Sequence, residues 1–278
     1  MLQSICALGL ALQMIIAPVW FRQPGCFGEH PGAVRPADSP SFAYNWFVRR
    51  EKDHRQPEID PTLAFAEEYG AYFIDHRHTS ETEEKVLYLT FDAGYENGNV
   101  EKILDVLKEE QVCGAFFVLS HLIDQNADLV RRMVSEGHLV CNHTAHHKDM
   151  TRCTSKEEFC RELNCLNEKY KALIGEDMPK FYRPPEGKFS RSNLACAMEA
   201  GYKTIFWSFA YADWDNAHQP SVSEAKKKIS DNIHNGAVLL LHPTSATNAA
   251  VLRDLIVDWK QQGYHFGTLY ELTAEPAQ

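Results

Sequence analysis

From Lys85 onward, short apolar runs rich in β-branched and aromatic residues alternate with segments whose apolar residues recur every three or four positions. The first pattern predicts buried strands, and the second predicts helices that cover them. Such alternation predicts a parallel sheet packed against helices. The expected strands are 86–91, 115–119, 138–141, 180–183, 204–208 and 237–241, and the expected helices lie within 100–107, 129–134, 159–173 and 252–259.

A parallel α/β sheet can stay open or close into a barrel. The chain lacks the Gly-rich dinucleotide fingerprint and the phosphate loop, which weakens the nucleotide-binding open sheet. Polar residues follow four of the expected strands: Asp92, His143, Arg183 and His242. Barrel enzymes gather catalytic groups at the carboxyl ends of their strands, although open sheets also bind ligands there. We therefore expect an α/β fold with a distorted parallel barrel.

The chain divides into three regions. Residues 5–21 are almost entirely apolar, so residues 1–25 predict a signal peptide or membrane anchor, although no Lys or Arg precedes the apolar run. Residues 26–80 predict an N-terminal extension packed on the barrel, and residues 81–275 a catalytic domain. We expect an exported protein that meets the membrane only through its leader. The net charge of -10 argues against nucleic acid as a partner.

A histidine-rich stretch follows the third expected strand. His143 and His147 are four residues apart, a spacing that can place two imidazoles on one metal ion. Thr144 stands where the zinc-protease helix has a Glu, so that helix is excluded. His146 can replace or assist either neighbour. Taken alone, the stretch fits a surface or packing role equally well.

Two charged residues follow other strands. Asp92 precedes Gly94 in a turn that would aim the carboxylate at a pocket, as a general base or a metal ligand. Arg183 precedes two prolines that would hold it rigidly, so its guanidinium can clamp a carboxylate. Helix capping and an ordinary surface turn are the respective alternatives.

An acid and its partner are predicted near the end of the chain. His242 follows a buried strand, where it is suited to act as a general acid. Asp213 lies among aromatic residues and can orient His242 and raise its pKa. The aromatic residues suggest a cleft for a sugar, although such residues more often belong to a core. A base, two metal ligands, an arginine clamp and an oriented acid are what metal-assisted amide hydrolysis requires.

The motifs around Asp92, His143, Arg183, Asp213 and His242 follow one another in that order between about Lys85 and about Leu272, and together they resemble the polysaccharide deacetylases with the NodB-type domain. The resemblance implies a distorted (β/α) barrel and a divalent metal, commonly zinc. It implies Asp92 as the catalytic base, Arg183 as its tether, Asp213 as the carboxylate that orients the acid, and His242 as the acid. It implies His143 and His147 as metal ligands, and we expect Tyr95, Trp214 and Leu241 to contact substrate.

One departure from that family narrows the resemblance. The family usually has a metal-binding Asp after the base, and Ala93 stands there. The stretch FDAGYENG at 91–98 looks like the delta-lactam-biosynthetic de-N-acetylases of spore-forming bacteria. The implied substrate is N-acetylmuramic acid in peptide-stripped peptidoglycan, and the implied product is the muramic δ-lactam of spore cortex. The alternatives are deacetylation of N-acetylglucosamine in peptidoglycan or chitin-like glycans, a glycan-binding protein impaired by Ala93, and a metal-binding protein without a sugar role.

Overall fold

The computed structural model describes residues 42–274. All of them belong to one compact unit that spans residues 37–278. The predicted leader and the first part of the predicted extension lie outside the described residues. In the part of the chain that is described, no helix is both long and apolar enough to cross a membrane.

The central element is a sheet of eight strands whose pairings are all parallel. The strand order is β11-β5-β6-β7-β8-β10-β4, with β12 beside β5. Bridges from Ile74 to Ala237 and from Phe209 to Leu239 join the far edge to β11. The predicted distorted barrel is therefore confirmed. The strands are β4 (Ala71–Tyr72), β5 (Lys85–Ala93), β6 (Ala115–Val118), β7 (Leu139–Asn142), β8 (Phe181–Tyr182), β10 (Lys203–Ile205), β11 (Ala237–Leu241) and β12 (Tyr264–Phe266).

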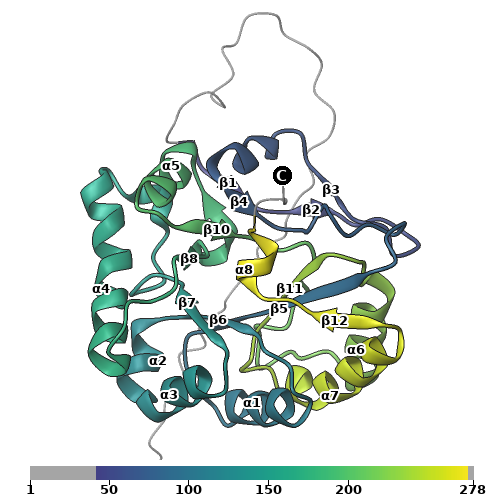
Figure 1. Ribbon diagram of the computed structural model, residues 1–278. Helices are drawn as coiled ribbons and strands as arrows, with labels where there is room; N and C mark the ends of the chain where they lie inside the picture. Colours follow the sequence, from purple (N-terminus) through teal and green to yellow (C-terminus); the bar gives the residue numbers. More distant parts are fainter. Residues whose placement is uncertain (1–41, 275–278) are drawn as a thin grey trace, which may run out of the picture. The chain divides into compact units, whose positions relative to one another are not determined.

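Helices lie along the outside of this sheet, except the last one, which packs against the inner-face cluster that includes Val86 and Tyr88 (Figure 1). They are α1 (Asn99–Glu109), α2 (Ser120–Gln125), α3 (Ala127–Ser135), α4 (Lys156–Ile174), α5 (Arg191–Glu199), α6 (Val222–Asn232), α7 (Ala246–Gln261) and α8 (Leu269–Leu272). Short 3₁₀ helices are η2 (Ala64–Tyr69), η3 (Met150–Arg152) and η4 (Pro185–Gly187). The sequence pattern did not predict α5, because Leu194 is the only large apolar side chain that it buries.

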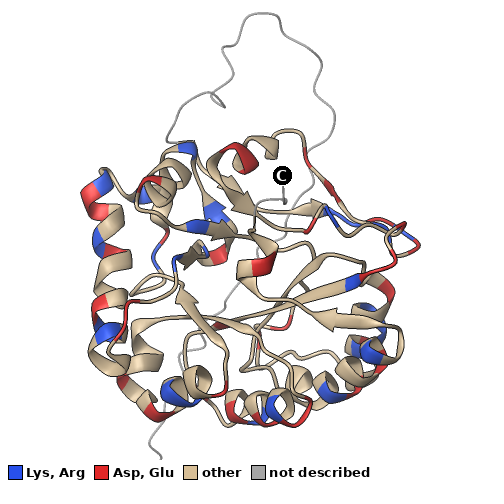
Figure 2. Ribbon diagram, in the orientation of Figure 1, with Lys and Arg blue, Asp and Glu red and all other residues tan. Residues whose placement is uncertain are grey.

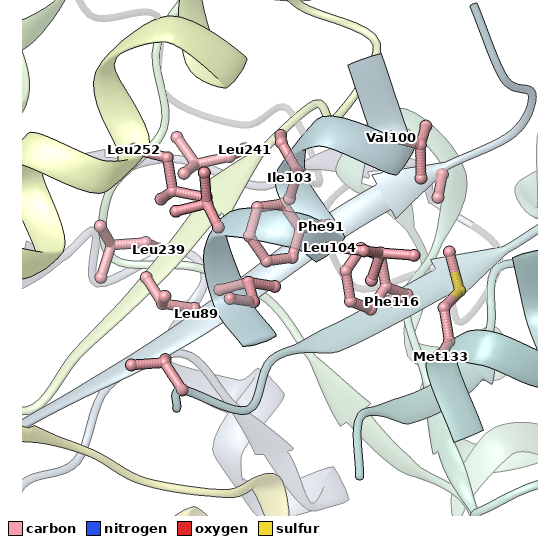
Figure 3. Close-up of a cluster of buried hydrophobic side chains, with 14 of the residues drawn as sticks. Leu89, Phe91, Val100, Ile103, Leu104, Phe116, Met133, Leu239, Leu241 and Leu252 are labelled. Carbon is pink, nitrogen blue, oxygen red and sulfur yellow. The ribbon is translucent and has the colours of Figure 1, made fainter. Parts of the chain in front are cut away.

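Side chains of β5 alternate between two environments. Leu87, Leu89 and Phe91 pack against the outer helices, in the same core cluster as Ile103 and Leu104 (Figure 3). Val86 and Tyr88 belong to a second cluster on the opposite face of the sheet. Because successive side chains of a strand point to opposite faces, Thr90 and Asp92 continue that inner face. Most charged residues belong to the outer helices and the loops (Figure 2).

The segment at 42–80 contributes strands of its own. β4 pairs with β10 in the main sheet, and β1 (Tyr44–Asn45) pairs antiparallel with β9 (Lys188–Phe189). A further pair joins β2 (Val48–Arg49) to β3 (Glu58–Ile59). Asp75 N–H donates to the Gly236 carbonyl at 2.9 Å, beside the Ile74–Ala237 bridge. This segment thus completes the wall of the barrel.

Gly236 is the tightest point of that closure. Its φ is +74°, and a Cβ there would lie 2.4 Å from the Asp75 carbonyl oxygen. We expect Gly236→Ala to lower the free energy of unfolding by about 2–4 kcal/mol, since left-handed strain adds to a backbone clash. Gly175→Ala is the matched control: φ is +96°, but nothing lies within 4 Å of its Cβ. It should cost about 1 kcal/mol. Equal losses in urea unfolding would contradict this account.

Candidate active site

A pocket of about 780 Å³ opens at the carboxyl ends of the strands. It combines charged and imidazole side chains with aromatic and aliphatic ones. Its lining residues are Asp92, Gly94, Tyr95, Leu119, His143, His147, Glu186, Trp207, Ala210, Tyr211, Trp214, Leu240, His242 and Thr244. The structure therefore brings residues from separate predicted motifs to one pocket, among them Asp92 and His242, which lie more than 100 positions apart in the sequence.

Arg183 follows β8 and is fully buried beneath the pocket. Nη1 donates to Asp92 Oδ1 at 2.8 Å, and Nη2 donates to Thr90 Oγ1 at 2.8 Å. Nε and Nη2 also donate to the carbonyl oxygens of Ile205 and Phe206, at 2.9 and 3.1 Å. The guanidinium plane lies over the Phe117 ring. These contacts leave Arg183 one orientation, as its position before two prolines predicts.

The Asp92 carboxylate remains ionised in this setting. Burial by itself would raise its pKa, but the charges of His143, Arg183 and His242 lower the pKa below its ordinary value. Burial lowers the pKa of His143 to about 4, so its imidazole is neutral near pH 7. Because His143 is then uncharged, the guanidinium of Arg183 is the neighbour that continues to stabilise the ionised Asp92 carboxylate. A carboxylate kept anionic beside open space is suited to accept a proton.

The two histidines expected to bind metal face each other at the pocket wall. Their ring centroids lie 5.0 Å apart. His143 Nδ1 lies 2.8 Å from the Arg183 carbonyl oxygen, so Nδ1–H donates and Nε2 carries the lone pair. Nε2 faces Asp92 Oδ2 at 3.5 Å, and two acceptors so placed favour a cation or a proton donor between them. His143 and His147 can therefore supply two of the ligands of a divalent ion such as zinc.

Residues 42–274 offer few further ligands for a metal ion at these two histidines. Among residues 42–274, no group of three or more His, Cys, Asp or Glu side chains forms a complete metal site. Ala93 is fully buried and belongs to the helix-facing core, and it does not line the pocket. The remaining coordination positions would thus be left to Asp92, water or substrate.

The structure separates His146 from its two neighbours. Its Nδ1 lies 3.0 Å from Glu162 Oε2 on α4, and Lys148 Nζ also pairs with Glu162. Thr144 and His147 both have positive φ, at 71° and 55°. Such backbone is strained for a β-branched residue, and strained residues concentrate at functional sites. The tight loop turns His143 and His147 into the pocket and leaves His146 outside.

Asp213 and His242 form a second pair at the pocket. Asp213 is fully buried and accepts hydrogen bonds from His242 Nδ1 at 2.7 Å and from His242 N–H at 2.8 Å. Burial alone would lower the pKa of His242, but the hydrogen bond and charge of Asp213 raise it above the ordinary value of 6.5. With Nδ1 occupied, Nε2 is the nitrogen that can deliver a proton.

Two of the three predicted substrate contacts lie at the pocket surface. Trp214 is 60% exposed with its ring 6.1 Å from that of His242, and Tyr95 is 44% exposed. Leu241 is a correction: its side chain is 1% exposed and packs against the outer helices. Strand alternation explains this, because Leu240, one residue earlier, is the β11 side chain that lines the pocket.

Sequence reasoning missed several lining residues. Glu186, shortly after Arg183, has a φ of 57°. Leu119 and Trp207 lie just past the ends of β6 and β10. A position just past a strand end was a signal available for Trp207 and Leu119. Thr90, which binds Arg183 from inside β5, carried no such signal because it lies within an apolar run.

The Asp213–His242 pair allows a test in the resting protein. We expect Asp213→Asn to lower the pKa of His242, because the lowering effect of burial is then opposed only by the charge of Asp92. Histidine-selective NMR titration measures this, with Asp215→Asn, an exposed carboxylate two residues away, as control. An unchanged His242 titration in Asp213→Asn would rule out this electrostatic role.

Comparison with known proteins gives consistent results. Residues 79–205 match the family model described as polysaccharide deacetylase. The chain is 38% identical over 245 residues to the peptidoglycan-N-acetylmuramic acid deacetylase PdaA of Bacillus subtilis (strain 168), covering 88% of this chain and 91% of that protein. The solved structure of that PdaA, a family 4 carbohydrate esterase, superposes with a TM-score of 0.78 at 38% identity, covering 84% of this chain and 98% of the other.

A second relative differs in its named substrate. The peptidoglycan-N-acetylglucosamine deacetylase PgdA of Listeria monocytogenes (serotype 1/2a, strain 10403S) is 34% identical over 196 residues. That match covers 70% of this chain and 40% of PgdA.

Proposed function

Because this chain belongs to the polysaccharide deacetylase family, a family of hydrolases that cleave the amide C–N bond of N-acetylated sugars, we propose that it deacetylates N-acetylmuramic acid in peptidoglycan. The observation that carries this proposal is the pairing at the pocket. An anionic carboxylate held by Arg183 and an imidazole held by Asp213 line the same 780 Å³ space. One pair is suited to accept a proton and the other to donate one.

The chain's own residues divide the reaction between them. Asp92 accepts a proton from the attacking water, and Arg183 holds the carboxylate in place as the water adds to the acetyl carbonyl. His242 then protonates the departing amine through Nε2, while Asp213 stabilises the imidazolium before the transfer. His143 and His147 would hold a divalent metal, for which we propose zinc; when bound, it would supply Lewis-acid polarisation of the acetyl oxygen.

The proposed substrate is peptidoglycan from which the peptide has been removed. Tyr95 and Trp214 present exposed aromatic faces at the pocket, which suits the apolar face of a sugar ring. The similarity to PdaA, named for N-acetylmuramic acid, extends over 88% of the chain. Deacetylation frees an amine that can condense with the lactyl carboxyl, with loss of water, to give muramic δ-lactam. We further propose an exported protein that acts on spore cortex.

A second candidate substrate is N-acetylglucosamine in peptidoglycan or a chitin-like glycan. The observation that favours it is the 34% identity to PgdA, which is named for that substrate. The chemistry at Asp92 and His242 would be the same, since both sugars carry the same acetamido group.

Acetate release tests the reaction. Wild-type protein, stripped of metal and then supplied with zinc, should release acetate from peptide-stripped peptidoglycan only when zinc is present. Asp92→Asn should reduce kcat by about 10²–10⁴-fold, since the base is lost. Asp105→Asn is the matched control, because that carboxylate pairs with Arg132 on the surface. A folded wild type that binds glycan but releases no acetate with any divalent metal would support an impaired glycan-binding protein.

Substrate identity needs a separate comparison. We expect kcat/KM on peptide-stripped glycan to exceed that on chitooligosaccharide by at least about tenfold, because the lactyl group adds contacts that N-acetylglucosamine lacks. Mass spectrometry of muramidase digests should show loss of acetyl on muramic acid, followed by loss of water on ring closure. Acetyl loss on glucosamine alone would favour the second candidate.

A further inference from the structure

Asn248 lies in the first turn of α7, behind the Asp213–His242 pair. Its side chain is 1% exposed, and it is not among the residues that line the pocket. It therefore cannot touch substrate directly. A buried amide has four hydrogen-bonding positions to satisfy, so its partners show what it holds.

Both amide hydrogens of Asn248 are directed at the acid pair. Nδ2 donates to Asp213 Oδ2 at 2.6 Å and to the His242 carbonyl oxygen at 3.0 Å. The Tyr211 hydroxyl donates to Asn248 Oδ1. The backbone N–H of Asn248 donates to Ser245 Oγ at 3.0 Å, which anchors the start of the helix. The amide can adopt only one orientation, since Oδ1 accepts while Nδ2 faces two acceptors.

Asp213 depends on this donor. Its Oδ2 accepts from Asn248 Nδ2 and from His242 N–H, whereas Oδ1 accepts from His242 Nδ1. The oxygens of a fully buried carboxylate need several hydrogen-bond donors, and Asn248 supplies one that does not come from His242 itself. Its second hydrogen bond fixes the His242 backbone relative to the same carboxylate.

We propose that Asn248 is a positioning residue that holds Asp213 and His242 in the geometry for proton donation. By sharing the Asp213 carboxylate, it also limits how strongly Asp213 stabilises the protonated imidazole of His242. This inference rests on the proposed function, in which His242 is the acid. A carboxylate shared with Asn248 binds the imidazolium less tightly than an unshared one. The histidine is thereby a stronger acid toward the leaving amine.

The charged groups that act on His242 define the expected direction. They are Asp213 from the loop after β10, Asp92 from β5 and Arg183 from β8. When the Asn248 donor is removed, the charge of Asp213 is less compensated. The pKa of His242 should then rise, and the alkaline limb of the kcat/KM profile should move to higher pH.

The test uses Asn248→Leu, which keeps the branching at Cγ but is larger and removes both amide donors, and Asn248→Ala as a second variant in case one does not fold. We expect kcat to fall about 10- to 100-fold, KM to change less than about twofold, and the alkaline limb to move upward. Asn235→Ala is the matched control. Asn235 is also buried and donates to Thr79 and Glu84 carbonyls at the other end of the barrel, so its loss should lower Tm without moving the limb.

Two results would overturn the proposal: an alkaline limb that stays in place or moves down, or a loss of kcat no larger than that of Asn235→Ala. The pKa of His242 is also measured by NMR in the resting protein, where it should rise in Asn248→Leu. That readout needs no substrate. If wild type releases acetate from no glycan, the proposed function fails, while the NMR titration still decides whether Asn248 controls His242.

Discussion

The buried guanidinium of Arg183 is the interaction on which the rest of the site depends. It links β8 to the carboxylate of Asp92 and the hydroxyl of Thr90 on β5, and to the backbone that leaves β10. A buried charge without partners is unfavourable by several kcal/mol, and removing one partner of a buried pair typically costs 3–5 kcal/mol. Arg183 therefore stabilises an ionised, correctly turned Asp92, and loss of that carboxylate would leave the guanidinium with neutral acceptors only. The proposed catalytic base is positioned by the same contact that stabilises this part of the barrel.

The two groups that we propose for proton transfer, Asp92 and His242, reach their charge states through opposite effects of their neighbours. Burial would neutralise both Asp92 and His242. Positive neighbours keep the pKa of Asp92 low, while Asp213 keeps the pKa of His242 high. One pocket can thus hold an anionic base and a protonated acid at the same pH. Each state is maintained by a partner of opposite charge, Arg183 or Asp213, that is itself fully buried.

The N-terminal segment shapes the pocket as well as closing the sheet. Trp46 N–H donates to the Gly187 carbonyl at 2.8 Å, and Trp46 Nε1–H donates to the Trp207 carbonyl at 2.9 Å. Arg50 donates to the Ala210 carbonyl. Trp207 and Ala210 line the pocket, and Gly187 adjoins the lining residue Glu186. The segment therefore supports two walls of the site from outside, a role that its irregular, proline-containing sequence did not indicate.

The sequence by itself determined the alternation of strands and helices, and with it the parallel sheet. Periodicity is local, so it can be read without tertiary contacts. It also placed Asp92, His143, Arg183 and His242 at strand ends, which meet at one edge of a parallel sheet. Tertiary structure alone decided which neighbours these groups have. His146 turns to Glu162 and Asn248 binds Asp213, because such contacts join residues distant in sequence and depend on packing that no local pattern records.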